Sequence, residues 1–282
     1  MAGVSAKDLR ARIHSMESTR QITKAMEMVA ASKLRGAQDK AISSRPYFET
    51  LYETMMELAE YRSDSVSPYA KVRTEGRVCC IVIAGDRGLA GGYNSNILKE
   101  VWAKIDGREA TVLPLGKKAV EFFRSRKVPL LTDDYTEAAS VSVGDCFTMA
   151  RLLSREFLKG EFSEVLLGYT NFVSVLSQTP AVLRLLPLDA AVGKKPEHPR
   201  PILFEPDCES VYDAIVPEYL GGLIYGALCE SVASEQAARR TAMDAATKNA
   251  DEMIDGLSLQ YNRARQGAIT QEITEIVAGA EN

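Results

Sequence analysis

The feature that most constrains the fold is the long stretch from Cys208 to Ala278, in which Pro217 is the only proline. Small and apolar residues recur along it at helical spacing: Ala242, Ala246, Ala250, Met253, Leu257, Ala264 and Ala268. A helix of about 60 to 70 residues would be on the order of 100 Å long, at 1.5 Å per residue. No ordinary globular domain can enclose such a helix, so the pattern predicts a coiled coil.

The amino-terminal segment predicts a second long helix. From Ser5 to Ser44 there is no proline, and Gly36 is the only glycine. Its apolar residues fall mostly at steps of three to five, which places them on one helical stripe: Leu9, Ile13, Met16, Ile22, Met26, Val29, Leu34, Ala37 and Ala41. We expect a kink or an interruption at Arg45-Pro46, because proline lacks a backbone donor. A helical pattern then resumes from Tyr47 to Leu58.

The two terminal helices are expected to pair with each other. Both leave the same middle domain, so they must run antiparallel. Their charges are complementary: residues 1–40 carry eight basic and four acidic side chains, and residues 208–282 carry five basic and twelve acidic ones. Alanines along the expected seam allow close approach of the two backbones. The sequence therefore predicts a long antiparallel coiled coil of residues 1–60 and 208–282.

The middle of the chain, residues 77–200, alternates predicted strands with predicted helices. A β-branched apolar run such as Val78–Ala84 is typical of a buried parallel strand. The predicted strands are Val78–Ala84, Ala110–Leu115, Val128–Leu131, Glu164–Tyr169 and Val182–Leu188, and the predicted helices are Ser95–Ile105, Lys117–Arg126 and Val143–Lys159. This order predicts a Rossmann-like, mostly parallel α/β domain.

A glycine-rich loop, Gly85 to Gly92, follows the first predicted strand, where a nucleotide phosphate would bind in a dinucleotide fold. Its spacing is not G-x-G-x-x-G, and neither this loop nor Gly116-Lys117-Lys118 forms a Walker loop. We interpret it as a tight turn whose Asp86 and Arg87 hold loops or meet a partner.

Composition and single residues narrow the function further. The formal net charge of -4 argues against a globally basic nucleic-acid binder. The five cysteines show no C-x-x-C spacing and are read as reduced thiols of a cytosolic protein. Neither His14 nor His198 has a nucleophile or a ligand set nearby in the sequence. The apolar stretch Leu220–Cys229 is about half a membrane span. We therefore expect no catalytic residue, cofactor, metal, secretory signal or membrane span.

The C-terminal helix is longer than its partner, so its tip is expected to project alone. Ile269, Ile273 and Ile276 nevertheless continue an apolar stripe there. Such a stripe fits a helix end that another protein surrounds. Fraying, or packing back onto the domain, is the alternative.

Three parts of the chain carry the motifs of one protein family: the first helix, the glycine-rich loop and the last helix. The residues are Arg12–Ser15 and Thr19–Lys33; Asp86–Leu89 and Gly91–Asn94; and Glu230-Ser231, Ser234-Glu235, Ala242-Met243, Ala246-Thr247, Tyr261–Gln266 and Ile269–Ala280. With these residues the chain resembles the gamma subunit of bacterial F-type ATP synthase. Two departures are Arg240, where the family usually has methionine, and Gly267, where alanine is common.

The resemblance implies a non-catalytic central rotor shaft at the cytoplasmic face of the bacterial membrane. Its partners would be the alpha and beta subunits, the epsilon subunit and the c-ring. By family motif, Met26, Arg265, Gln266 and Thr270 would face the beta subunits. The coupled ion, H⁺ or Na⁺, and the direction of ATP turnover stay open. A coiled-coil chaperone or scaffold, and a nucleotide-dependent enzyme with dimerising arms, are the rival readings.

Overall fold

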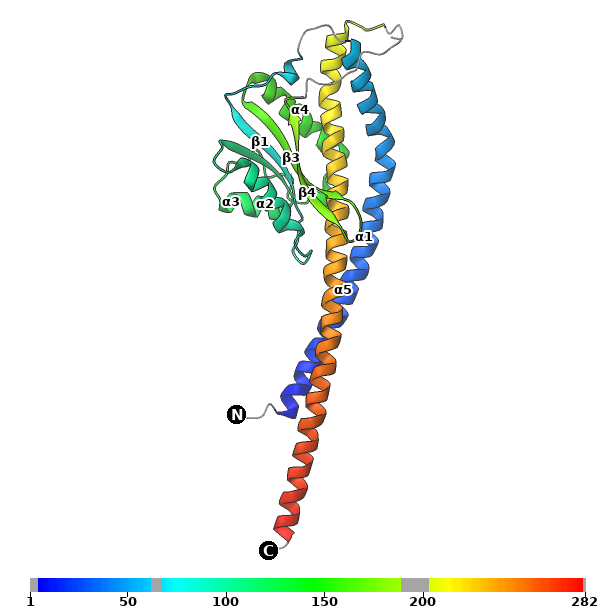
Figure 1. Cartoon of the computed structure of the whole chain (residues 1–282), viewed down its shortest axis with the longest axis vertical. Coiled ribbons are helices and arrows are strands. Elements are labelled where there is room, and N and C mark those ends of the chain that lie inside the picture. The colour runs from blue at the N-terminus through cyan, green and yellow to red at the C-terminus, as the bar shows by residue number, and fades with distance from the viewer. Residues whose placement is uncertain (1–4, 62–66, 189–202, 281–282) are drawn as a thin grey trace. The chain divides into compact units, whose positions relative to one another are not determined.

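The computed structural model describes residues 5–61, 67–188 and 203–280, and these form two units. One unit combines Met1–Ala31 with Arg239–Asn282, and the other is Ser32–Ala238. Two long helices, α1 (Ala6–Tyr61) and α5 (Cys208–Ala280), contribute to both units. The remaining elements are η1 (Pro68–Ala70), β1 (Arg77–Ile83), α2 (Tyr93–Ile105), β2 (Ala110–Leu115), α3 (Lys117–Ser125), η2 (Ala138–Ser140), α4 (Val143–Lys159), β3 (Phe162–Phe172) and β4 (Gln178–Leu186) (Figure 1).

The larger unit contains a four-stranded sheet in the order β2-β1-β3-β4. Strand β1 is parallel to β2 and to β3, whereas β4 is antiparallel to β3. Parallel strands need crossover helices, and α2, α3 and α4 supply them. The prediction of a mostly parallel α/β domain is confirmed, and the antiparallel β4 makes the sheet a mixed one.

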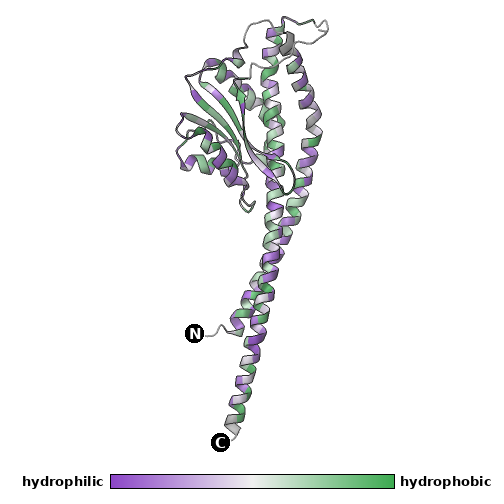
Figure 2. Cartoon of the chain, in the orientation of Figure 1, coloured by the Kyte–Doolittle hydropathy of each residue, from purple (hydrophilic) through white to green (hydrophobic). Residues whose placement is uncertain are grey.

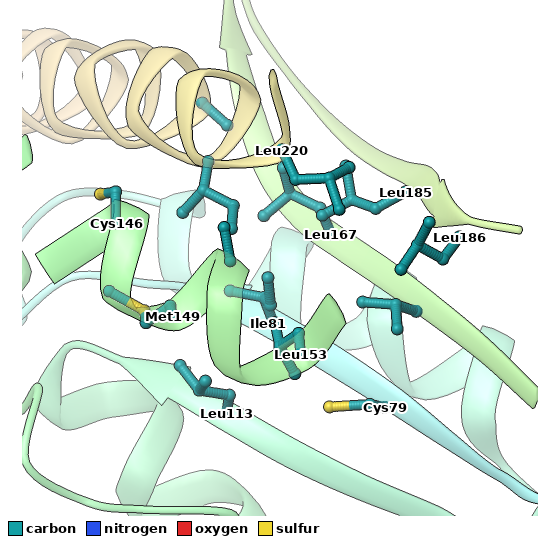
Figure 3. Packing of buried hydrophobic residues seen from close by; sticks show 14 of the residues in the cluster. Cys79, Ile81, Leu113, Cys146, Met149, Leu153, Leu167, Leu185, Leu186 and Leu220 are labelled. Atoms are coloured by element: carbon teal, nitrogen blue, oxygen red, sulfur yellow. The ribbon is translucent and has the colours of Figure 1, made fainter. Parts of the chain in front are cut away.

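Alternate residues of β1 face opposite sides of the sheet, as the two-residue period of a strand requires. One face packs against α4 and α5 through Cys79, Ile81 and Ile83. The other packs against α2 and α3 through Val78, Cys80 and Val82. Figure 3 shows the first of these layers, where Leu220 of α5 and Leu153 of α4 meet Ile81 and Leu167 of the sheet. Helices therefore cover both faces of β1, whose residues after Arg77 are all apolar. Polar residues occur in β3 and β4, and Figure 2 accordingly shows purple as well as green segments in the strands.

Local signals fix the ends of α4. Ser142 and Asp145 form a capping box at its start. The hydrogen bonds from the Ser142 side chain and backbone hold the pKa of Asp145 below its usual value. Gly160 ends the helix in the left-handed conformation, with a φ of 89°.

One expectation about local structure was wrong, and another was wrong in part. No strand forms at Val128–Leu131, where the only pairing within the described residues is a single bridge from Leu130 to Val112. Pro129 lacks the amide hydrogen that a longer ladder would need. Of the kink or interruption expected at Arg45-Pro46, the interruption does not occur, because α1 continues through Pro46. A proline removes only one backbone donor, and the helical residues on both sides carry the helix past it.

The smaller unit consists of the remaining parts of α1 and α5. Arg20 lies 3.3 Å from Asp251, and Thr23 lies 2.8 Å from Thr247. Residue numbers rise along α1 while they fall along α5, so the two segments run antiparallel within this unit. Their buried side chains are mostly small or unbranched: Leu9, Thr23, Ala30, Met243 and Ala250.

The predicted stripe on α1 was wrong at two positions. Ile22 and Val29 are 60% and 56% exposed, whereas their neighbours Thr23 and Ala30 are buried. Two closely approaching backbones leave room only for small side chains. The size of a side chain therefore decides more than its hydrophobicity whether it is buried between the two helices.

Candidate functional site

The C-terminal tip of α5 presents apolar side chains to solvent. Ile269, Ile273 and Ile276 are 42%, 56% and 72% exposed. The register set by Arg20 and Asp251 explains this exposure: Ala6, the first residue of α1, lies fourteen positions before Arg20, and Arg265 lies fourteen beyond Asp251. Helix α1 thus begins level with Arg265, and the residues of α5 beyond Arg265 have no α1 segment beside them within the described helices. An exposed apolar stripe of this kind marks a binding surface.

The four residues expected to contact a partner fall into two groups. Arg265, Gln266 and Thr270 lie on little more than one turn of the tip and are exposed. The Thr270 hydroxyl donates to the backbone carbonyl of Gln266 at 3.0 Å, so its side chain folds against the helix. Met26 is half-buried on α1. The same register places it level with residue 245, about 30 Å along the axis from Arg265.

A second apolar surface lies on the outside of α1, and the sequence pattern did not predict it. Ile22, Met28 and Val29 are each more than half exposed. Ile22 and Val29 are seven residues apart, so they share one side of the helix. The sequence pattern places Ile22 and Val29 on the apolar stripe of α1, and Met28 lies outside that stripe. Together with the tip, this surface makes two exposed apolar stretches in the smaller unit.

In the larger unit, the glycine-rich loop is tied down by its own side chains. Asn94 Oδ1 accepts the Gly85 amide hydrogen at 2.7 Å, and Asn94 Nδ2 donates to the carbonyl of Arg87. Asp86 Oδ1 accepts the Ala138 amide hydrogen at 2.8 Å. Leu89, at a positive φ of 62°, is 64% exposed at the turn. Asp86 therefore holds a neighbouring loop, as one reading of the motif expected.

The position where a Rossmann fold binds phosphate is filled by α5. Glu235 is 5% exposed and lies against Gly85, where an added Cβ would meet the Glu235 carboxylate at 2.8 Å. This is the carboxyl end of β1, the usual ligand position of a parallel sheet. A carboxylate there disfavours a second anion. The geometry thus gives the glycine-rich loop a packing role against α5.

Two serines of α5 fasten it to the sheet. Thr170 of β3 lies beyond the last residue of β1 that pairs with β3, so its outward N–H and C=O have no strand beside them. The Ser231 hydroxyl accepts the Thr170 amide hydrogen at 3.1 Å, and the Ser234 hydroxyl donates to the Thr170 carbonyl at 3.2 Å. Both serines are fully buried. Helix α5 therefore replaces a strand at this end of the sheet.

The chemistry of the remaining side chains favours packing over reaction. The five cysteines, all of which lie within the described residues, form no disulfide bond. Burial raises the pKa of Cys79 to about 12, which leaves it protonated and unreactive at neutral pH. The described residues hold no group of three or more His, Cys, Asp or Glu that could bind a metal. Among the helices described, none is long and apolar enough to cross a membrane. His198 lies outside the described residues.

Comparison with known proteins assigns the chain to a family. Residues 5–282 match a family model described as ATP synthase. The ATP synthase gamma chain of Ruminococcus albus is 46% identical over 281 residues, and the match covers 98% of both chains. The sodium-ion-specific gamma chain of Acetobacterium woodii is 39% identical, again over 98% of both chains.

Solved structures share the fold. A chain in the OSCP/F1/c-ring structure of Euglena gracilis mitochondrial ATP synthase aligns with a TM-score of 0.68 and 20% identity, over 98% of this chain and 93% of that one. A chain in the central stalk/c-ring structure of Tetrahymena thermophila mitochondrial ATP synthase aligns with a TM-score of 0.57, over 80% of this chain and 99% of that one. With near-complete coverage by close sequence relatives, this chain belongs to the gamma-chain family of bacterial F-type ATP synthases.

Proposed function

We propose that this chain turns as the central rotor shaft of an F-type ATP synthase, inside a ring of three alpha and three beta subunits. The observation that carries this proposal is the exposed apolar stripe on the tip of α5, beyond the start of α1. A solitary helix in water gains no stability from exposed isoleucine side chains. A sleeve of surrounding subunits would cover them and act as a bearing.

The shaft itself would be one antiparallel coiled coil along most of α1 and α5. Contacts within each unit support it. In the smaller unit Thr23 pairs with Thr247, and in the larger unit Leu34 and Ala37 cluster with Ala233 and Ala237. The domain organisation would then be residues 1–60 and 208–282 for the shaft and 77–200 for the α/β domain.

The mechanism would be mechanical coupling without a catalytic group on this chain. Ion flow would turn the c-ring, and the α/β domain, beside the epsilon subunit, would turn with it. The asymmetric shaft would force the beta subunits through different conformations in turn. The chain would work as a peripheral subunit at the cytoplasmic face of the cell membrane. Met26, Arg265, Gln266 and Thr270 would contact the beta subunits.

Deleting residues 264–282 should weaken the binding of this chain to the ring of alpha and beta subunits. Ile269, Ile273 and Ile276 would each lose about 1.5–3 kcal/mol of apolar burial. The test is co-expression with alpha and beta subunits, followed by size-exclusion chromatography and an ATPase assay. The full chain should co-elute as one copy per hexamer, and the truncated chain should co-elute less and change ATP turnover. A full chain that elutes apart from the ring and binds nucleotide by itself would overturn the rotor proposal.

Replacing Arg265 and Gln266 together by alanine should lower coupled ATP turnover by roughly tenfold or more. Hydrogen bonds to a charged group contribute about 1.5–3 kcal/mol, and 1.4 kcal/mol is a factor of ten. The assay is ATP-driven ion pumping in reconstituted vesicles. Arg155→Ala, which removes an exposed arginine of α4, serves as the control and should pump normally. Unchanged pumping by the double variant would remove these two residues from the beta-subunit contact.

A further inference from the structure

A pair of threonines connects α1 and α5 in the smaller unit. Thr23 is 9% exposed, and its Oγ1 lies 2.8 Å from Oγ1 of Thr247. Each hydroxyl also lies near a carbonyl of its own helix: Thr23 is 3.0 Å from the Arg20 oxygen, and Thr247 is 2.8 Å from the Met243 oxygen. The four oxygens therefore form a chain that crosses the seam.

The two hydroxyl protons can be arranged along this chain in two ways. Thr23 can donate to Thr247 while Thr247 donates to the Met243 carbonyl. Alternatively, Thr247 can donate to Thr23 while Thr23 donates to the Arg20 carbonyl. Both arrangements keep the bond between the helices, because each hydroxyl has one donor and two acceptor sites. The connection between α1 and α5 is thus maintained whichever way the protons point.

Around the threonines, the seam does little to fix the axial position of one helix against the other. Apart from Leu9 near the start of α1, the other described residues buried in this unit are Ala30, Ala250 and the unbranched Met243. Small side chains make a smooth surface, and a flexible thioether can adapt to a shifted neighbour. A polar residue at a core position is the usual device that selects one register of a coiled coil.

The ion pairs around the threonines do not select the register alone. Arg20 and Asp251 are about half exposed, so their pairing adds little. Asp255 lies one helical turn beyond Asp251 on the same side of α5, so Arg20 would find a new carboxylate after a slip in that direction. Thr23 would instead come level with Asp251, whose carboxylate is half exposed. After a slip the other way, Thr23 would come level with Met243, and Thr247 with the exposed Thr19. Either slip would replace the buried bond between Thr23 and Thr247 by one at an exposed position.

We propose that Thr23 and Thr247 are positioning residues that fix the axial register of α1 against α5. A shaft that transmits torque must not slip along its own seam, and this consequence rests on the proposed rotor function. The register itself does not depend on that function. It can therefore be tested on the full chain without the ring.

The test measures the distance between spin labels placed along the axis. Arg12→Cys on α1 and Thr241→Cys on α5 are exposed sites. By the register of Arg20 and Asp251 they lie eighteen residues apart along the axis, about 27 Å. Cys208→Ser removes the one half-buried native thiol, and the other four are buried. Pulsed electron resonance on the full chain then reports the register.

Thr23→Val with Thr247→Val should add a second distance, shifted by about 5 Å, which is one helical turn. The midpoint of urea unfolding should stay the same or rise, because valine has the shape of threonine. Each single valine variant should also show the second distance. It loses the bond between the helices, and its remaining hydroxyl still donates to the carbonyl of its own helix. Thr23→Ser with Thr247→Ser should restore the single distance.

The matched control is Thr19→Val, an exposed threonine of α1 that donates to the Ser15 carbonyl. It should keep a single distance. If the double valine variant also keeps one distance as narrow as the wild type, the proposal fails. If the full chain does not assemble with alpha and beta subunits, the rotor function fails, and the label distances still decide the register.

Discussion

Replacing Gly116 by alanine should lower the free energy of unfolding of the larger unit by about 3 kcal/mol or more. Gly116 joins β2 to α3 at a φ of 94° and a ψ of 144°, a region that costs other residues about 1–3 kcal/mol. A Cβ there would also overlap the Ala84 carbonyl oxygen at the end of β1. Ala84 directly follows β1, is buried, and donates its amide hydrogen to the Leu115 carbonyl, so its oxygen cannot easily move aside. Urea unfolding, followed by circular dichroism, measures the loss.

Gly107→Ala separates the two causes. Gly107 also has a positive φ, 76°, but an added Cβ there would meet no described atom within 4 Å. Its substitution should therefore cost only the backbone strain, about 1–2 kcal/mol. Equal losses for the two variants would mean that the approach of Gly116 to Ala84 contributes nothing.

Local patterns predicted the α/β domain because each of its elements is specified locally. The apolar run of β1 and the capping residues Ser142 and Asp145 of α4 each define an element without knowledge of its neighbours. The errors arose at prolines, whose effect the apolar pattern does not give. Leu130 lies beside Val112, but the adjacent Pro129 allows only a single bridge. Pro46 lies within a helix that continues on both sides of it, so it does not interrupt α1.

The candidate site was predictable only in part for the same reason. The stripe of Ile269, Ile273 and Ile276 is periodic, so the sequence predicted it, and it is exposed as expected. The burial of Thr23 in place of Ile22 depends on how closely two distant helices approach, which no local pattern reports. The contact of Glu235 with Gly85 likewise joins residues far apart in the chain.

Replacing Ser231 and Ser234 together by alanine should destabilise the attachment of the sheet to α5. The substitution would leave the N–H and C=O of Thr170 buried without their helix partners. An unsatisfied buried polar group costs about 1–3 kcal/mol, so the pair should cost about 2–6 kcal/mol. Urea unfolding gives the total, and amide hydrogen exchange at Thr170 should accelerate more than exchange in the middle of β1.

Ser154→Ala provides a matched comparison, because it also removes a buried serine hydroxyl. Ser154 is 2% exposed, and its Oγ has no hydrogen-bond partner within the part of the chain that the structure describes. Its substitution should be neutral or stabilising, since a lone buried hydroxyl costs free energy. The opposite signs would follow from the hydrogen-bond partners alone. Helix α5 holds β3 because two hydroxyls satisfy the N–H and the C=O of Thr170, which lies beyond the last residue of β1 that pairs with β3. If both changes destabilised equally, loss of volume would explain them, and the hydrogen bonds to Thr170 would not be what ties the shaft helix to the sheet.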